Sequence, residues 1–313
     1  WYKNTSEDLL YAVPVPEQAG VSNTTVTMNA ASMNNSGFEF SATYRNRDHD
    51  FKYEVSANLS TLRNRVTSLG FGTDSYISGS YITKVGEEIG QFYGWVYEGI
   101  ARTQEVLDNH ATQEGAQIGD CLYKDVNNDG KVDSEDQVVL GSGMPKINFG
   151  LNARFEYKRF DLSIATFGAL NYHVSDDIYN SLNSCYGWGN KEVGMLDANR
   201  FSEDGSTYLS NVPRTYVTNS ASLGWNDLFS SRKIQNAAYW KIANVELGYN
   251  FPDKWFDKYV SDVRFYISAQ NLHTFTGYHG YNVDYAGGTF TPGYNFCSYP
   301  TARTFMCGVH FTF

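Results

Sequence analysis

Several features that define other protein classes are scarce or missing in this sequence. Only 19% of its 313 residues are charged, and it holds just 7 prolines. No apolar run reaches the roughly 18 residues that a membrane-crossing helix needs. The 4 cysteines form no Cys-x-x-Cys pair, so a zinc or redox motif is not indicated. The net charge of -10 argues against nucleic acid as a partner.

No catalytic motif stands out either. The sequence lacks a Gly-x-Ser-x-Gly elbow, and no spacing marks a pair of carboxylates for glycosidase chemistry. The 6 histidines are scattered without metal-ligand spacing. A Ser, a His and an Asp occur in any chain of this size, so their presence is no evidence of a triad. We therefore do not expect an enzyme.

Aromatic residues are abundant instead. They make up 16% of the chain, with 24 Tyr and 20 Phe, and there are 28 glycines. Helix-favouring residues do not dominate. This composition favours an all-β protein.

Apolar and polar residues alternate in run after run, which is the pattern of strands with two different faces. Such runs cover residues 38–44, 51–59, 147–157, 160–164, 263–269 and 304–313. The final run ends on Phe313, an aromatic that suits the girdle of a membrane barrel. We expect polar turns at 34–37, 46–50 and 158–159, and a bulge near 243–244.

The connections between these strands are short at one end and long at the other. The long ones are residues 101–144, 171–236 and 276–300. Short turns on one side and long outer loops on the other are typical of outer-membrane barrels. The prediction is a transmembrane antiparallel β-barrel, to which this chain contributes about ten strands. A soluble β-sandwich also alternates and remains the alternative. Because the chain opens on Trp1 without a Met, we expect it to be part of a longer protein.

One acidic stretch matches the calcium loop of EF-hands. Residues 125–136 read Asp-Val-Asn-Asn-Asp-Gly-Lys-Val-Asp-Ser-Glu-Asp. The ligands in order would be Asp125, Asn127, Asp129, the Lys131 carbonyl, Asp133 and Asp136. The last is Asp rather than Glu, so it reaches less far. We expect this loop to bind Ca²⁺, with Mg²⁺ as the second option; the alternative is a polar turn without metal.

The aromatics of segment 171–236 are the candidate substrate contacts. Tyr186, Trp188 and Trp225 could stack on sugar rings or cover peptide side chains. The alternative for each is a place in a membrane girdle or in the packing of the loop itself. Cys185 and Cys297 also lie in loops, and the sequence fits a disulfide between them as well as free thiols.

Six stretches together resemble a known family. They are Gly-Gln-Phe-Tyr-Gly-Trp-Val-Tyr-Glu-Gly-Ile at 90–100, Tyr-Lys-Asp-Val-Asn-Asn-Asp-Gly-Lys at 123–131, Ser-Arg-Lys-Ile at 231–234, Leu-Gly-Tyr-Asn-Phe-Pro at 247–252, Ser-Ala-Gln-Asn-Leu-His-Thr-Phe-Thr-Gly at 268–277 and Tyr-Pro-Thr-Ala-Arg-Thr at 299–304. In this order they resemble the C-terminal portion of a SusC-like TonB-dependent outer-membrane transporter of Bacteroidetes. The resemblance covers nearly the whole chain.

The resemblance implies a barrel of roughly 22 strands in outer-membrane lipid, with multiple passes. Residues 1–313 would be the C-terminal part of the barrel domain. The plug domain and the TonB-contacting N-terminal part would be absent from this chain. It also implies a SusD-like surface lipoprotein as a lid, with transporter-lid pairs that dimerise.

The function implied by the resemblance is TonB-dependent import of an oligosaccharide or a peptide. Two alternatives stay open at this point. The first is a calcium-dependent glycan-binding or adhesion module without transport. The second is an outer-membrane enzyme with carboxylates at the barrel rim.

Overall fold

Strands dominate the computed structural model of this chain, as the composition predicts. It describes residues 1–14, 25–69, 73–185, 189–215, 224–252, 255, 262–284 and 287–312. The α-helices are α1, Gln104–Asp108, and α2, Asp177–Leu182. Neither these nor any other helix among the described residues has the length and hydropathy to cross a membrane. The all-β prediction is confirmed.

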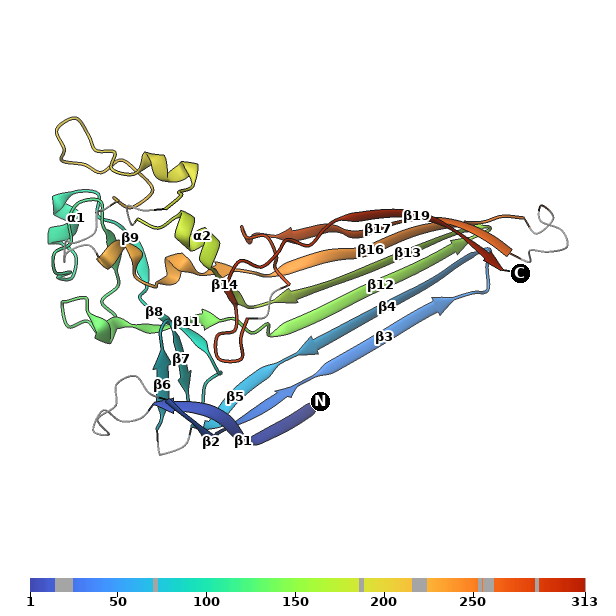
Figure 1. Ribbon diagram of the computed structural model, residues 1–313, viewed down its shortest axis with the longest axis horizontal. Coiled ribbons are helices and arrows are strands. Elements are labelled where there is room, and N and C mark those ends of the chain that lie inside the picture. The colour runs from blue at the N-terminus through green and yellow to red at the C-terminus, as the bar shows by residue number, and fades with distance from the viewer. Residues whose placement is uncertain are drawn as a thin grey trace.

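The largest element is a seven-stranded antiparallel sheet with the order β19-β17-β16-β13-β12-β4-β3. Its long strands run side by side across Figure 1. Their bounds are β3 Glu39–Asn46, β4 Phe51–Thr61, β12 Ile147–Tyr157, β13 Phe160–Leu170, β16 Tyr239–Asn250, β17 Asp262–Thr276 and β19 Thr304–Thr312. Each of these strands pairs with the next of the seven along the chain, and shorter strands intervene between β4 and β12, β13 and β16, and β17 and β19. This is the meander expected of a barrel wall.

One face of this sheet is apolar from edge to edge. Residues directly opposite each other in a ladder share a face, and the register matches apolar with apolar. Leu151 faces Ala57, while Ile267 faces Leu247 on one side and Cys307 on the other. Many members of this face are exposed: Phe40, Leu59, Leu151, Phe160, Leu247, Phe265, Ile267, Phe305 and Val309. In water such a face would be covered by a second layer, so its exposure here fits a lipid-facing wall.

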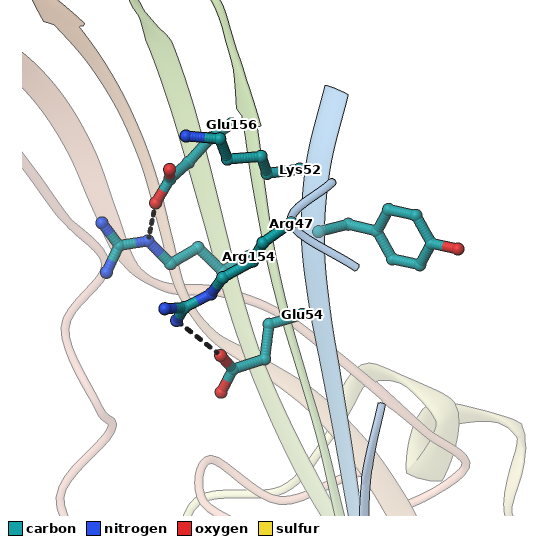
Figure 2. Close-up of a pocket in the computed structure, with 6 residues that line it drawn as sticks. Arg47, Lys52, Glu54, Arg154 and Glu156 are labelled. Atoms are coloured by element: carbon teal, nitrogen blue, oxygen red, sulfur yellow. Dashed lines mark ion pairs between the residues drawn. The ribbon is translucent and has the colours of Figure 1, made fainter. Parts of the chain in front are cut away.

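The other face is polar and carries ion pairs near the short turns. In Figure 2, Arg154 approaches Glu156 at 3.1 Å, and Arg47 lies 3.7 Å from Glu54. With Lys52 these side chains line a cavity of about 350 Å³. A charged face of this kind suits the interior of a large barrel.

The predicted turns at 46–50 and 158–159 are confirmed, because β3 ends at Asn46, β4 begins at Phe51, and Tyr157 pairs directly with Phe160. The bulge predicted near 243–244 is also present. On the β13 side, the adjacent residues Ala165 and Thr166 pair with Asn244 and Ile242, so Ala243 is an extra residue in β16. The extra residue restores the apolar phase that the sequence pattern loses there.

The turn predicted at 34–37 is wrong. Strand β2, Thr25–Gly37, continues through this segment and pairs with β1 and β5. The amide of Asn35 is not a turn cap, because its Oδ1 accepts a hydrogen bond from Asn64 Nδ2 at 2.7 Å. A Cβ at Gly37 would lie 1.8 Å from the Thr61 carbonyl oxygen, so glycine permits close strand approach here rather than chain reversal.

Smaller sheets form at the end of the main sheet that carries the long connections (Figure 1). Their strands are β1 Tyr2–Pro14, β2, β5 Arg63–Ser68, β6 Ser75–Ser78, β7 Tyr81–Lys84, β8 Gln91–Gly94, β9 Tyr97–Ile100, β10 Cys121–Tyr123, β11 Val138–Ser142, β14 His173–Asp176, β15 Gln235–Asn236 and β18 Tyr294–Asn295. The 3-10 helices are η2 Ser134–Asp136, η3 Val193–Asp197, η4 Gly224–Asp227 and η5 Ser231–Lys233. We call this region the loop end.

The buried apolar clusters mostly lie at the loop end. One surrounds Cys121, Tyr123 and Val132, and another surrounds Tyr172 and Val174. The described parts of the long connections are therefore packed structure with their own cores. They are the part of the chain able to hold side chains in fixed positions around a ligand.

Candidate functional site

A buried ion pair joins two of the long connections. Arg214 Nη2 donates to Asp120 Oδ2 at 3.0 Å, and Asp120 is fully buried. Asn226 Nδ2 donates to the same carboxylate at 2.7 Å, and Asn226 Oδ1 accepts from the Cys121 backbone N–H at 2.7 Å. A buried charge needs such partners. Sequence reasoning missed this network, because single polar residues 94 positions apart leave no local pattern.

A second buried polar cluster joins the third long connection, residues 276–300, to segment 171–236. The Tyr278 hydroxyl donates to the Asp176 carboxylate, which also receives Asn295 Nδ2 at 3.2 Å. The other Asp176 oxygen caps α2 by accepting the Tyr179 N–H at 2.9 Å. Burial, with the nearby Asp176 charge, raises the pKa of Tyr278, so its proton stays in place. Segment 276–300 is thereby fixed to segment 171–236.

The first half of loop 125–136 has the hydrogen bonds of a calcium loop. The Asp125 carboxylate accepts the N–H groups of Asp129 at 3.3 Å and Gly130 at 2.8 Å. Asn127 Oδ1 accepts the Asp129 N–H at 2.9 Å, and Asp129 Oδ1 accepts the Lys131 N–H at 3.0 Å. Each oxygen accepts with one lone pair and keeps another for a cation. These three side chains fit the first, third and fifth ligand positions.

The second half of the loop is arranged differently. Asp136 is buried, and its two oxygens accept the N–H groups of Val126 and Asp133, each at 2.8 Å. Lys131 Nζ lies 2.5 Å from Asp133 Oδ2, and this pair lowers the pKa of Asp133. Among the described residues, no three His, Cys, Asp or Glu side chains gather closely enough to hold a metal. In this conformation Asp136 stabilises the loop through hydrogen bonds to backbone N–H groups. Metal binding by the loop stays a prediction.

Of the three candidate substrate aromatics, Tyr186 and Trp188 lie outside the described residues. Trp225 lies in η4, where its indole Nε1 donates to the Glu114 carbonyl at 2.8 Å. It borders a cavity of about 630 Å³ that Trp95 also lines. Sequence reasoning missed Trp95, because residues 90–99 have the composition of a strand and nothing in them marks a ligand contact.

A second cavity, of about 710 Å³, lies beside α2. Its lining includes Asp177 and Asp227 together with Lys191 and Lys233. Burial lowers the pKa of Lys233, although the Asp227 charge opposes that shift. A cavity lined by both signs of charge could pair with a ligand that carries both, such as a short peptide.

All four cysteines are free in the structure, so no bond joins Cys185 and Cys297. Cys121 and Cys185 are fully buried, whereas Cys297 is exposed. Burial raises the pKa of Cys121 to about 12 and that of Cys185 to about 11. Such thiols pack as small apolar groups rather than as nucleophiles.

Comparison with known proteins agrees with this architecture. No family model matches the chain. It is 30% identical to TonB-dependent receptor P3 of Formosa agariphila and 25% identical to TonB-dependent receptor SusC of Bacteroides thetaiotaomicron. Each match covers 100% of this chain, and 32% and 29% of the respective relative. The chain belongs to the SusC-like TonB-dependent receptors.

The fold agrees with that membership. The solved RagAB peptide transporter superposes with a TM-score of 0.78 and 22% identity, covering 99% of this chain and 32% of the other. The 'open-open' state of the RagAB peptide importer gives a TM-score of 0.73. The chain thus spans about a third of the length of its SusC-like relatives. The seven-stranded sheet is part of a transporter barrel wall, as the alternation predicts.

Proposed function

We propose that this chain forms the C-terminal part of the barrel of an importer that moves a nutrient across the outer membrane with energy from TonB. The observation that carries the proposal is the match of the whole chain to TonB-dependent receptors, combined with a sheet that is apolar on one face and charged on the other. In this proposal segments 101–144, 171–236 and 276–300 are outer segments. The chain performs no bond chemistry itself.

The partners in this proposal follow from the family. A SusD-like lipoprotein covers the loop end as a lid, and two transporter-lid pairs assemble. TonB acts through a plug domain and an N-terminal segment carried by the rest of the protein. The similarity of the fold to the RagAB peptide importer supports these partners.

The substrate in this proposal is an oligosaccharide or a peptide held at the loop end. Trp225 beside the 630 Å³ cavity supports a sugar, and the mixed charges of the 710 Å³ cavity support a peptide. Tyr186 and Trp188 remain proposed contacts on sequence grounds alone.

We also propose that loop 125–136 binds Ca²⁺, or Mg²⁺ in its place. Asp125, Asn127 and Asp129 would supply side-chain oxygens, and Lys131 its carbonyl. Asp133 and Asp136 would have to leave the partners described above to complete the set. The role of the metal would be to neutralise the loop carboxylates and stiffen an outer segment.

Purification of the native protein from membranes in detergent tests the central proposal. Mass spectrometry of the eluate should find a longer parent chain or an N-terminal companion, together with a surface lipoprotein. Uptake of the nutrient by cells should stop when TonB is removed. A water-soluble species of this chain travelling alone would contradict the proposal and favour the glycan-binding module.

A further inference from the structure

The cavity that carries this inference lies between two indole rings at the loop end. Trp95 follows β8, and Trp225 belongs to η4. The cavity measures about 630 Å³, within the usual range of small-ligand sites. Besides the indoles and two glycines, its wall consists of Glu114, Asp133 and Leu228 with Ser134. Four stretches of the chain therefore meet around it, at residues 95, 114–115, 133–134 and 224–228.

Both indoles are held in fixed orientations. Trp95 Nε1 donates to the Asp133 carbonyl at 3.1 Å, and Trp225 Nε1 donates to the Glu114 carbonyl at 2.8 Å. The ring of Tyr123, which is only 1% exposed, lies 6.5 Å from the Trp95 ring and 6.2 Å from the Trp225 ring. The Tyr123 hydroxyl also donates to the Trp225 carbonyl. The half-buried rings thus offer a rigid aromatic surface that loses little entropy on binding.

The polar part of the wall consists mainly of acceptors. No Lys, Arg or His is among the described residues that line the cavity. The Asp133 carboxylate is paired with Lys131 Nζ at 2.5 Å, which leaves the Glu114 carboxylate as the main charge of the wall. An anionic ligand would be repelled here, whereas hydroxyl groups could donate to Glu114, Asp133 and Ser134.

We propose that this Trp95–Trp225 cleft binds a neutral sugar ring, as a subsite of the importer proposed above, on which this inference rests. The C–H faces of a pyranose match the indole faces, and its hydroxyl rim matches the acceptors. A peptide fits less well. Its terminal carboxylate would meet Glu114 without a compensating cation, and both indole N–H groups already donate to the backbone.

The test uses the full-length protein, purified in detergent with its co-purifying lipoprotein. An array of neutral gluco-, manno-, xylo- and galacto-oligosaccharides, with acidic oligosaccharides and short peptides beside them, selects the ligand. Calorimetry then compares Trp225→Ala and Trp95→Ala with Trp255→Ala. Trp255 is a matched control, because it is 67% exposed and lies in the connection between β16 and β17.

We expect a neutral oligosaccharide to bind, and each cleft variant to lose about tenfold or more in affinity, while Trp255→Ala keeps wild-type affinity. Trp225→Phe should restore part of the loss. Since Trp95 packs against the buried Tyr123, its removal could disturb folding. Glu114→Gln provides a second measurement with little change of shape, and it should weaken binding severalfold.

Unchanged affinity in the Trp225 and Glu114 variants would overturn the subsite, as would binding of only acidic glycans or peptides. Uptake by cells distinguishes this failure from failure of the importer itself. If uptake still depends on TonB, the importer stands and only the cleft is wrong. If uptake does not depend on TonB, the proposed function fails as well.

Discussion

At the scale of single residues, burial decides which thiols can react. The pKa of Cys185, about 11, reduces its thiolate fraction near pH 8 about a hundredfold relative to a free thiol. Cys297 is exposed, so a reagent in solution can reach its sulfur. We expect brief treatment with iodoacetamide at pH 8 to modify Cys297 but neither Cys121 nor Cys185. Mass spectrometry of native and denatured samples provides the comparison, and a Cys185–Cys297 disulfide would leave both unmodified in each.

The Asp120–Arg214 pair should hold segments 101–144 and 171–236 together. Asp120→Ala would leave the Arg214 guanidinium, 16% exposed, without its buried partner. Breaking such a pair costs about 3–5 kcal/mol when fully buried, and somewhat less here because Arg214 keeps some water contact. Hydrogen exchange should therefore speed up in residues 101–144 and 189–215.

Asp204→Ala is the matched control for this experiment. Asp204 lies in the same region, but its carboxylate accepts from the neighbouring Ser202 and Ser206 within one turn of chain. Equal exchange in the two variants would show that the ion pair does not join the segments.

The role of a single residue can be predicted from the sequence only where the pattern that marks it is local. The ligand order of loop 125–136 is visible because calcium loops use fixed spacing. Nothing in the sequence shows that Lys131 pairs with Asp133 or that Asp136 turns to backbone N–H groups. Likewise, nothing shows that Asn226 reaches Asp120, since that contact arises only when two long connections pack.

At the scale of elements, loop 125–136 gives a prediction about metal. We expect calorimetry with Ca²⁺ to show binding to the wild-type protein and its loss in Asp125→Ala/Asp129→Ala, because these carboxylates hold the first half of the loop. The temperature at which the loop end unfolds should rise with Ca²⁺ only in the wild type. Absence of heat with both Ca²⁺ and Mg²⁺ would favour the metal-free turn.

The two faces of β12 give a second prediction at this scale. Leu151 lies on the apolar face and Asn152 on the polar one. Leu151→Arg should destabilise the protein in lipid by about 2–4 kcal/mol if the residue lies near the bilayer centre, while Asn152→Arg should cost far less. Folding into vesicles, followed by urea titration, measures both. Similar costs for the two variants would contradict a lipid-facing wall.

Long strands were predictable because alternation is repeated over many residues, and even the bulge of β16 showed as a lost phase. The error at 34–37 has a clear cause. Asn and Gly are typical of turns, but here Asn35 pairs across strands and Gly37 permits a close approach. Apart from β8 and β9, whose stretch has strand character in the sequence, the short strands and helices of the loop end escaped prediction because tertiary packing, rather than periodicity, fixes them.

At the scale of the whole molecule, the main sheet has two open edges, β3 and β19, among the described strands. Open edges and an exposed apolar face both favour association between chains. We expect these 313 residues, expressed alone in water, to collect in aggregates that detergent disperses. Centrifugation with and without detergent measures this, and a monodisperse water-soluble monomer would contradict the barrel-wall assignment.

The ion pairs on the polar face have a consequence for selectivity. Near the turns the bases Arg45, Arg47, Lys52, Arg154 and Arg264 interleave with the acids Glu54, Glu156, Asp161 and Glu246. Because neighbouring charges of opposite sign cancel over a short distance, a solute passing this wall meets little net field. In the importer proposed above, this stretch of wall would be a poor charge filter, and sorting of cargo would fall to the loop end.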